Sequence, residues 1–342
     1  MKNKESKKRI FYLDELRAIA ILAVIFCHAG NLYPYILDNL KVATPFFVSN
    51  LGRIGVPIFL MLSGALLLNR EYELTDFFKR RYSRILIPFI FWVIVTVILK
   101  IAFFQNKPDE IISWCLGKGL LWYIWELFGL YLFVPVINEF IKKYKMQGVK
   151  YLLIIWIIYL VITNFKIDIF PNLNLQYFGG FIGYMVLGYY LVHNEFNIKP
   201  KYMIIFGFLL FLSCYIINCR LSLITGGTIK YMVISMILQG TGVFITIKYI
   251  AKCCETNPQS FISRIHNRIE HGLIGKAIIS ISICSYGMYF LHYIIYRFWD
   301  LLINPQSLKL LPILFIITSV LSWIIILALS KIPYIDKISG AK

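Results

Sequence analysis

Four ionisable side chains stand inside long apolar stretches of this sequence. They are Arg17, His28, Arg53 and Glu126, and Asp14 stands at the beginning of the first stretch. If these stretches cross a membrane, each charge is costly to place there, so the residues are functional candidates by default. A neutral imidazole can remove the proton of a hydroxyl group, and an arginine can hold a phosphate through its planar fork of donors. The residue types therefore suit a proton transfer near a binding site for a phosphorylated molecule.

The spacing of three of these residues places them on one face of a single helix. At about 100° per residue, Asp14, Arg17 and His28 fall within about 60° of one another. Arg17 and His28 are about 16 Å apart along the helix axis, so one end of this face carries a cation and the other an imidazole. Asp14 either pairs with Arg17 or stabilises the helix start against its dipole. A lone membrane histidine can also serve only as a hydrogen bond between helices.

The elements that position these residues are membrane-spanning helices. The chain of 342 residues is 59% hydrophobic and 17% aromatic, with a mean hydropathy of +0.72. The apolar residues come in continuous blocks of about 18–22, the length that crosses the hydrocarbon core as a helix. We therefore predict an all-α polytopic membrane protein of about ten transmembrane helices. The expected spans are 11–33, 46–68, 83–104, 119–140, 150–165, 175–193, 201–219, 229–251, 277–298 and 309–331.

The net charge of +18 lies in clusters between the apolar blocks. About 24 Lys and Arg residues fall in one alternate set of connections and about 7 in the other, so the positive-inside rule places the first set in the cytoplasm. Both termini belong to that set, as an even number of spans requires. No separate basic domain exists to bind nucleic acid, which is excluded as a partner. The predicted environment is the lipid bilayer of the cytoplasmic membrane, with the chain crossing it many times.

The connections are too short for a second domain, so residues 1–342 are expected to form one transmembrane domain. The longest internal connection has apolar residues at four-residue spacing, which predicts an amphipathic helix near 258–273 on the inner membrane surface. His193, His266 and His271 lie in cytoplasmic connections and are expected to be solvated. None of the seven cysteines forms a C-x-x-C pair, so we expect neither a metal site nor a disulfide framework.

Five short segments follow one another along nearly the whole chain. They are Leu13-Asp14-Glu15-Leu16-Arg17-Ala18-Ile19-Ala20 with His28; Gly52-Arg53-Ile54-Gly55-Val56-Pro57-Ile58-Phe59 with Ser63-Gly64; the stretch from Lys79 to Pro88 with Arg81 and Arg84; Leu121-Trp122-Tyr123 with Gly129-Leu130-Tyr131-Leu132 and Pro135; and Ser285-Tyr286-Gly287-Met288-Tyr289 with His292. Together they resemble the acyltransferase-3 family, in which a basic residue and a histidine of the first helix are separated by ten residues. One departure is Leu120, where many members have a histidine; the role of that side chain would be absent or pass to Glu126.

The resemblance implies an integral-membrane O-acyltransferase. Such an enzyme moves an acyl group, usually acetyl, from cytoplasmic acyl-CoA to a hydroxyl of a cell-surface glycan or a lipid-linked sugar. His28 would act as general base, with Asp14 counted among the catalytic residues, or would carry the acyl group itself. Acetyl-CoA or another acyl-CoA would be the co-substrate, without a metal. Its phosphates would bind Arg17, Arg80, Arg81 and Arg84, although the last three also fit a simpler role as topology signals.

The acceptor would contact a second set of residues, Arg53, Trp122, Tyr123, Glu126 and His292. Arg53 would bind an anionic part of the acceptor or pair with Glu126. Trp122 and Tyr123 would stack on a sugar or belong to an aromatic belt at the membrane interface. His292 would line the cavity or pack between helices.

Two other functions compete with the enzyme. A transporter or flippase also places polar residues along a membrane cavity, and a non-catalytic subunit of an envelope assembly would tolerate any change at His28. The cytoplasmic arginines aligned with His28 favour the enzyme, because a transporter needs no phosphate clamp. The sequence also lacks the paired, broken helices that inverted repeats produce.

Overall fold

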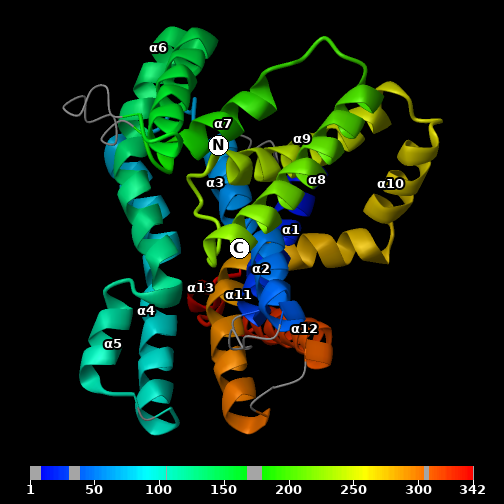
Figure 1. Cartoon of the computed structure of the whole chain (residues 1–342). Helices are drawn as coiled ribbons and strands as arrows, with labels where there is room; N and C mark the ends of the chain where they lie inside the picture. Colours follow the sequence, from blue (N-terminus) through cyan, green and yellow to red (C-terminus); the bar gives the residue numbers. More distant parts are fainter. Residues whose placement is uncertain (1–8, 31–38, 105, 168–178, 304–307, 342) are drawn as a thin grey trace.

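The computed structural model describes residues 9–30, 39–104, 106–167, 179–303 and 308–341, and these residues form helices without a strand (Figure 1). The helices and short 3-10 turns are α1 (Phe11–Gly30), α2 (Asn39–Gly52), α3 (Gly55–Leu67), α4 (Leu74–Ala102), α5 (Pro108–Cys115), η1 (Gly119–Leu121), α6 (Trp122–Asn164), α7 (Ile182–His193), α8 (Pro200–Thr225), α9 (Ile234–Thr256), α10 (Phe261–His271), α11 (Leu273–Ile303), η3 (Leu308–Leu310), α12 (Leu311–Leu329) and α13 (Asp336–Ser339).

The protein is an all-α polytopic membrane protein. Within the described residues, seven helical stretches are long and apolar enough to cross a bilayer. They contain α2 with α3, α4, α5 with α6, α8, α9, α11 and α12. The 20-residue α1 carries several charges and α7 has only 12 residues, so neither qualifies on length and composition. The count of ten spans and the cytoplasmic position of both termini stay predictions.

The 43-residue α6 is a hairpin of two helices rather than one rod. Its backbone is not helical at Lys145, where φ is 50° and ψ is −136°. The rings of Phe140 and Tyr151 have centroids 6.1 Å apart, whereas eleven residues of straight helix would separate them by about 16 Å. The chain therefore turns back between these rings, at the basic segment that was predicted to separate the spans 119–140 and 150–165. Two segments lie side by side below the α6 label in Figure 1.

Close helix packing in the core depends on positions that lack a side chain. A Cβ atom at Gly64 of α3 would lie 1.8 Å from the carbonyl oxygen of Met185 in α7. A Cβ atom at Gly188 of α7 would lie 1.9 Å from the carbonyl oxygen of Met61 in α3. The two backbones therefore touch directly, which is how membrane helices gain van der Waals contact without a hydrophobic driving force.

A buried amide network joins α2 to α8 and α9. Asn50 donates its side-chain amide to the Ser222 hydroxyl at 2.8 Å, and Asn218 donates to the Gln239 side chain at 2.7 Å. Gln239 in turn donates to the backbone carbonyl of Asn50 at 3.1 Å. Because unpaired polar groups are costly in a bilayer, this network fixes the C-terminal turn of α2 against its neighbours. None of these residues was predicted from the sequence to have a role.

The amphipathic helix predicted near 258–273 is observed as α10. Its apolar side chains Phe261 and Ile265 are exposed and suit contact with lipid. The opposite face packs on the protein, and it is here that the sequence interpretation is wrong. His266 is only 7% exposed, and its Nε2 lies 3.1 Å from a carboxylate oxygen of Glu15 in α1. Periodicity shows which face of a helix is polar, but it does not show that the polar face is covered.

Candidate functional site

Two histidines from distant parts of the chain meet in the core. His28 lies in the last two turns of α1 and His292 lies in the middle of α11, and their ring centroids are 5.3 Å apart. The two helices are held in register here, because the Tyr296 hydroxyl of α11 donates to the carbonyl of Ile25 at 3.0 Å. The sequence pointed to both histidines separately; only the fold places their rings side by side.

The hydrogen bonds of His292 determine which of its nitrogens is available. Its Nδ1 lies 2.9 Å from the carbonyl oxygen of Met288, one turn earlier in α11. A carbonyl can only accept, so Nδ1 carries the hydrogen and Nε2 carries the lone pair. Nε2 is buried and has no hydrogen-bond partner in the described residues. His292 therefore offers an unused acceptor beside His28.

Arg53 reaches the same region from a break in the second span. Helix α2 ends at Gly52 and α3 begins at Gly55, so Arg53 stands between two helical segments. A Cβ at Gly52 would lie 2.5 Å from the backbone nitrogen of Cys27, which shows how tightly the break is pressed against α1. The guanidinium of Arg53 lies over the Tyr231 ring, 4.6 Å from its centroid, and its buried Nε has no partner among the described residues.

The alternative in which Arg53 pairs with Glu126 is wrong. Both residues belong to the described part of the chain, and no ion pair or hydrogen bond joins them there. Glu126 is half-buried in α6. Opposite charges in two spans suggested a pair, but the helices do not bring these two side chains together.

Aromatic rings line the space in front of the two histidines. Trp122 stacks on Tyr231 at 5.1 Å between ring centroids, and Tyr123 lies 5.7 Å from Tyr289. The Tyr289 hydroxyl donates to the carbonyl of Leu120 and so holds the segment just before Trp122 against α11. A cavity of about 20 Å³ lies among these residues, enough space for about one water molecule. It is lined by His28, Trp122, Tyr123, Tyr231 and Tyr289, among others.

Asp14 and Arg17 form a separate cluster at the start of α1. Asp14 is 4% exposed and is held by the fork of Arg9, with nitrogen–oxygen distances of 2.5 and 2.7 Å. It also accepts from the Ser282 hydroxyl of α11 at 2.6 Å. Arg17 lies 3.5 Å from the same hydroxyl. The close partner of Asp14 is thus Arg9 rather than Arg17, and this contact raises the pKa of Arg9.

Asp14 cannot act directly on His28, because fourteen residues of helix separate the two by about 21 Å along the axis. The cluster at the start of α1 and the histidine pair therefore occupy two levels of the same helix pair. Ser282 belongs to the first level and His292 to the second, and both lie on α11.

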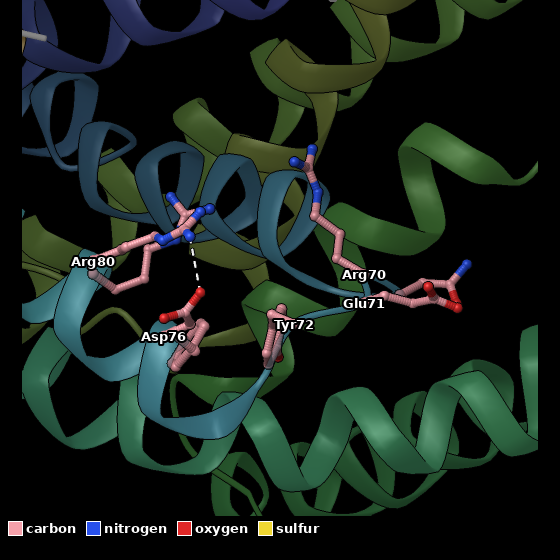
Figure 2. A pocket seen from close by; sticks show the side chains of 8 residues that line it. Arg70, Glu71, Tyr72, Asp76 and Arg80 are labelled. Carbon is pink, nitrogen blue, oxygen red and sulfur yellow. Dashed lines mark hydrogen bonds and ion pairs between the residues drawn. The ribbon is translucent and has the colours of Figure 1, made fainter. Parts of the chain in front are cut away.

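The arginines at the start of α4 face a larger cavity of about 570 Å³. Arg70, Arg80 and Arg81 line it together with Tyr72, Glu71 and Asp76, as Figure 2 shows for the labelled residues. Arg80 is exposed and donates to Asp76 at 2.8 Å (Figure 2). Arg81 is half-buried, whereas Arg84 is exposed one turn further along.

Asn138 of α6 holds the connection that carries Arg70. Its side-chain oxygen accepts from the backbone nitrogen of Arg70 at 3.0 Å, and its side-chain nitrogen donates to the Arg70 carbonyl at 2.9 Å. Asn69 beside it has a φ of 56°, in the left-handed region. The fully buried Asn138 thus shapes one wall of the cavity. It was not found from the sequence, where a single asparagine at the end of an apolar run carries little signal.

Comparison with known proteins assigns the family. The model of a family described as an acyltransferase domain, acyltransferase-3, matches residues 10–330. The chain belongs to this family. Of the residues described for the candidate site, all except Arg9 lie within the match.

A curated relative is the peptidoglycan O-acetyltransferase OatA of Listeria monocytogenes serovar 1/2a (strain ATCC BAA-679 / EGD-e). It is 33% identical over 111 residues, a segment that covers 30% of this chain and 15% of the relative. No solved structure matches the acyltransferase chain. Within the described residues, no group of three or more His, Cys, Asp or Glu side chains is arranged to hold a metal ion, and the seven cysteines are free.

Proposed function

We propose that this acyltransferase is a membrane O-acyltransferase that moves an acyl group, acetyl in the first instance, from acyl-CoA to a hydroxyl group. The acceptor is a sugar of a cell-surface glycan or its lipid-linked precursor. The observation that carries the proposal is the position of His28 at a buried cavity, beside the unused acceptor nitrogen of His292. The similarity to a peptidoglycan O-acetyltransferase over part of the chain supports acetyl and a glycan.

The donor binds from the cytoplasmic side. Coenzyme A carries several phosphates, and arginine matches phosphate oxygens in charge and geometry. The cavity lined by Arg70, Arg80 and Arg81 supports this end of the donor. Arg80 already pairs with Asp76, so Arg81 is the stronger candidate for a phosphate contact. Arg17 and Arg84 extend the positive charge towards the bundle.

The thioester end of the donor would then reach the level of His28. Arg17 and His28 are about 16 Å apart along α1, a separation that an extended pantetheine arm is suited to cover. Asp14 serves as a positioning residue in this scheme. It holds Arg9 and Ser282 at the start of α1 and does not touch the reacting atoms.

The chemical step needs a base and a place for the acceptor. His28 removes the proton of the acceptor hydroxyl while the oxygen attacks the thioester carbonyl. The carbon–sulfur bond then breaks, and the protonated imidazole returns the proton to the sulfur of coenzyme A. Arg53 supplies positive charge for an anionic part of the acceptor, and Trp122 offers a ring face for a sugar. An acyl-histidine route uses the same residues, with the acyl group passing through His28.

The deciding experiment is acyl-CoA turnover by the purified full-length protein in detergent or liposomes, with a crude glycan acceptor. Wild type is compared with His28→Ala and Arg81→Met, and His193→Ala serves as the matched control, since His193 is an exposed histidine on α7. We expect transfer in wild type and control, a loss of about 10²–10⁴-fold in His28→Ala, and weaker acetyl-CoA binding in Arg81→Met.

If all four proteins neither bind nor turn over acetyl-CoA, catalysis is refuted. Solute or lipid transport is then the function to assay. A burst of coenzyme A release that precedes acceptor addition would select the acyl-histidine route over the general-base route.

A further inference from the structure

A second cluster of cations lies at the opposite end of α4 from the arginine cavity. Lys100 stands in the last turn of α4, Trp114 near the end of α5, and Arg297 on α11. Figure 1 shows the end of α4, α5 and the C-terminal part of α11 at the same end of the molecule. The Trp114 and Tyr293 rings stack at 6.2 Å between centroids and connect α5 to α11.

Lys100 forms no ion pair with a carboxylate in the described part of the chain. Lys100 is 6% exposed, and its ammonium group makes no hydrogen bond or ion pair with any residue that the structure describes. Its only polar contacts are ring faces, with Nζ 5.1 Å from the centroid of Trp114 and 5.7 Å from that of Tyr293. Arg297 adds a second positive charge, which acts on Lys100 repulsively, while the Glu110 carboxylate at the start of α5 attracts it.

Two further donors at this place are unused. The Nε1 of Trp114, in a residue that is 6% exposed, and the Nε of Arg297 are both buried without a hydrogen-bond partner. The neighbouring carboxylates already accept hydrogen bonds, and one of them pairs with Arg297 itself. Asp300 accepts from the Nη1 of Arg297 at 3.2 Å, and Glu110 accepts from the Asn106 side chain and the Lys107 backbone at the start of α5.

Such an arrangement is unfavourable unless something completes it. A buried charge without a partner is costly, and each buried donor without an acceptor adds to that cost. Contact with aromatic faces offsets only a part of it. An anion with several oxygens would satisfy the ammonium, the indole N–H and the guanidinium N–H together, and a phosphate group has that geometry.

We propose that Lys100, Trp114 and Arg297 bind the phosphate of a lipid-linked sugar acceptor. The site is open to lipid, since Ile98, Ile101 and Phe103 at the same end of α4 have large exposed apolar surfaces. It lies on the same helix as one of the two histidines, because Arg297 follows His292 on α11 by about 7.5 Å along the axis and about 140° around it. A sugar attached to a lipid phosphate held here would extend along α11 towards the level of His28. This assignment rests on the proposed acyl transfer for the identity of the acceptor, but the phosphate site itself does not depend on it.

The test is lipid binding to the purified full-length protein in detergent, measured as the shift of its thermal unfolding temperature and by native mass spectrometry. The probes are a polyprenyl phosphate, phosphatidylglycerol and inorganic phosphate. We compare wild type with Lys100→Met, Trp114→Phe and, as a matched control, Lys118→Met, because Lys118 is an exposed lysine before α6.

We expect the polyprenyl phosphate to stabilise wild type and Lys118→Met. Its affinity should fall by about tenfold or more in Lys100→Met and severalfold in Trp114→Phe, which loses the N–H donor together with part of the ring area. Without ligand, Lys100→Met should unfold at a higher temperature than wild type, since it removes an uncompensated buried charge.

Equal binding by wild type, Lys100→Met and Trp114→Phe would overturn the site. If Lys100→Met does not fold, Trp114→Phe decides alone. Tighter binding of phosphatidylglycerol or inorganic phosphate than of the polyprenyl phosphate would overturn the acceptor assignment. Failure of acyl-CoA turnover in wild type, together with intact lipid binding, would refute the proposed function and leave the phosphate site standing.

Discussion

The contact between His266 and Glu15 should control how firmly α10 is docked on the protein. The two side chains are 8% and 12% exposed, and His266 Nε2 lies 3.1 Å from the Glu15 carboxylate. The hydrogen bond that His266 donates to the Glu15 carboxylate raises the pKa of His266, against the lowering effect of burial. The change to make is Glu15→Gln, which keeps the size and an acceptor oxygen but removes the charge.

The magnitude follows from the type of hydrogen bond. A bond to a charged group contributes about 1.5–3 kcal/mol and a neutral one about 0.5–1.5 kcal/mol, so the substitution should cost about 1–1.5 kcal/mol. That is about a five- to tenfold change in the opening equilibrium of α10. Because the folded-state pKa is raised, the contribution is complete below the ordinary pKa of about 6.5 and is lost as pH rises through the raised value.

Amide hydrogen exchange in residues 261–271, corrected for intrinsic rates, measures this equilibrium. Wild-type protection should fall as pH rises past the raised pKa, and Glu15→Gln should exchange about five- to tenfold faster at low pH, with a smaller difference from wild type at high pH. Glu270→Gln is the control, because Glu270 lies 4.0 Å from His266 and is more exposed. A wild-type profile that does not change with pH, or equal exchange in Glu15→Gln and wild type at low pH, would refute the reasoning.

Three other substitutions test the site. Asn138→Ala removes both hydrogen bonds to the Arg70 backbone. In a steady-state assay the KM for acyl-CoA should therefore rise while kcat changes less than threefold. A fall in kcat alone would contradict the assignment of this cavity to the donor. Gly52→Leu places carbon atoms where Cys27 lies. The rate of acyl transfer should therefore fall about 100-fold or more, even in protein that purifies as a monodisperse species. Near-normal turnover would show that the α1–α2 contact does not position His28. His292→Phe keeps an aromatic ring but removes the acceptor Nε2. The kcat should fall about tenfold or more, while the affinity for acetyl-CoA, measured by calorimetry, stays within twofold. An unchanged kcat would mean that His292 serves only in helix packing.

The sequence by itself determined the class of protein and the family to which it belongs. Continuous apolar blocks require helices in lipid, because a helix satisfies its backbone hydrogen bonds within one segment. The pattern of α10 needed only local periodicity, and the spacing of Arg17 and His28 needed only the rise of one helix. The family resemblance was also readable, since its motifs are short and local, and the family match confirms it.

The tertiary structure decided which of these residues meet. No periodicity links His28 to His292, Asp14 to Arg9 and Ser282, or Asn138 to Arg70, because each pair depends on how whole helices rotate and slide against one another. The same holds for Lys100, which in the sequence is one more lysine at the end of an apolar run. Its position over the rings of Trp114 and Tyr293 exists only once α4, α5 and α11 are packed, since a helix sequence specifies the direction of its side chains but not the neighbours that they face.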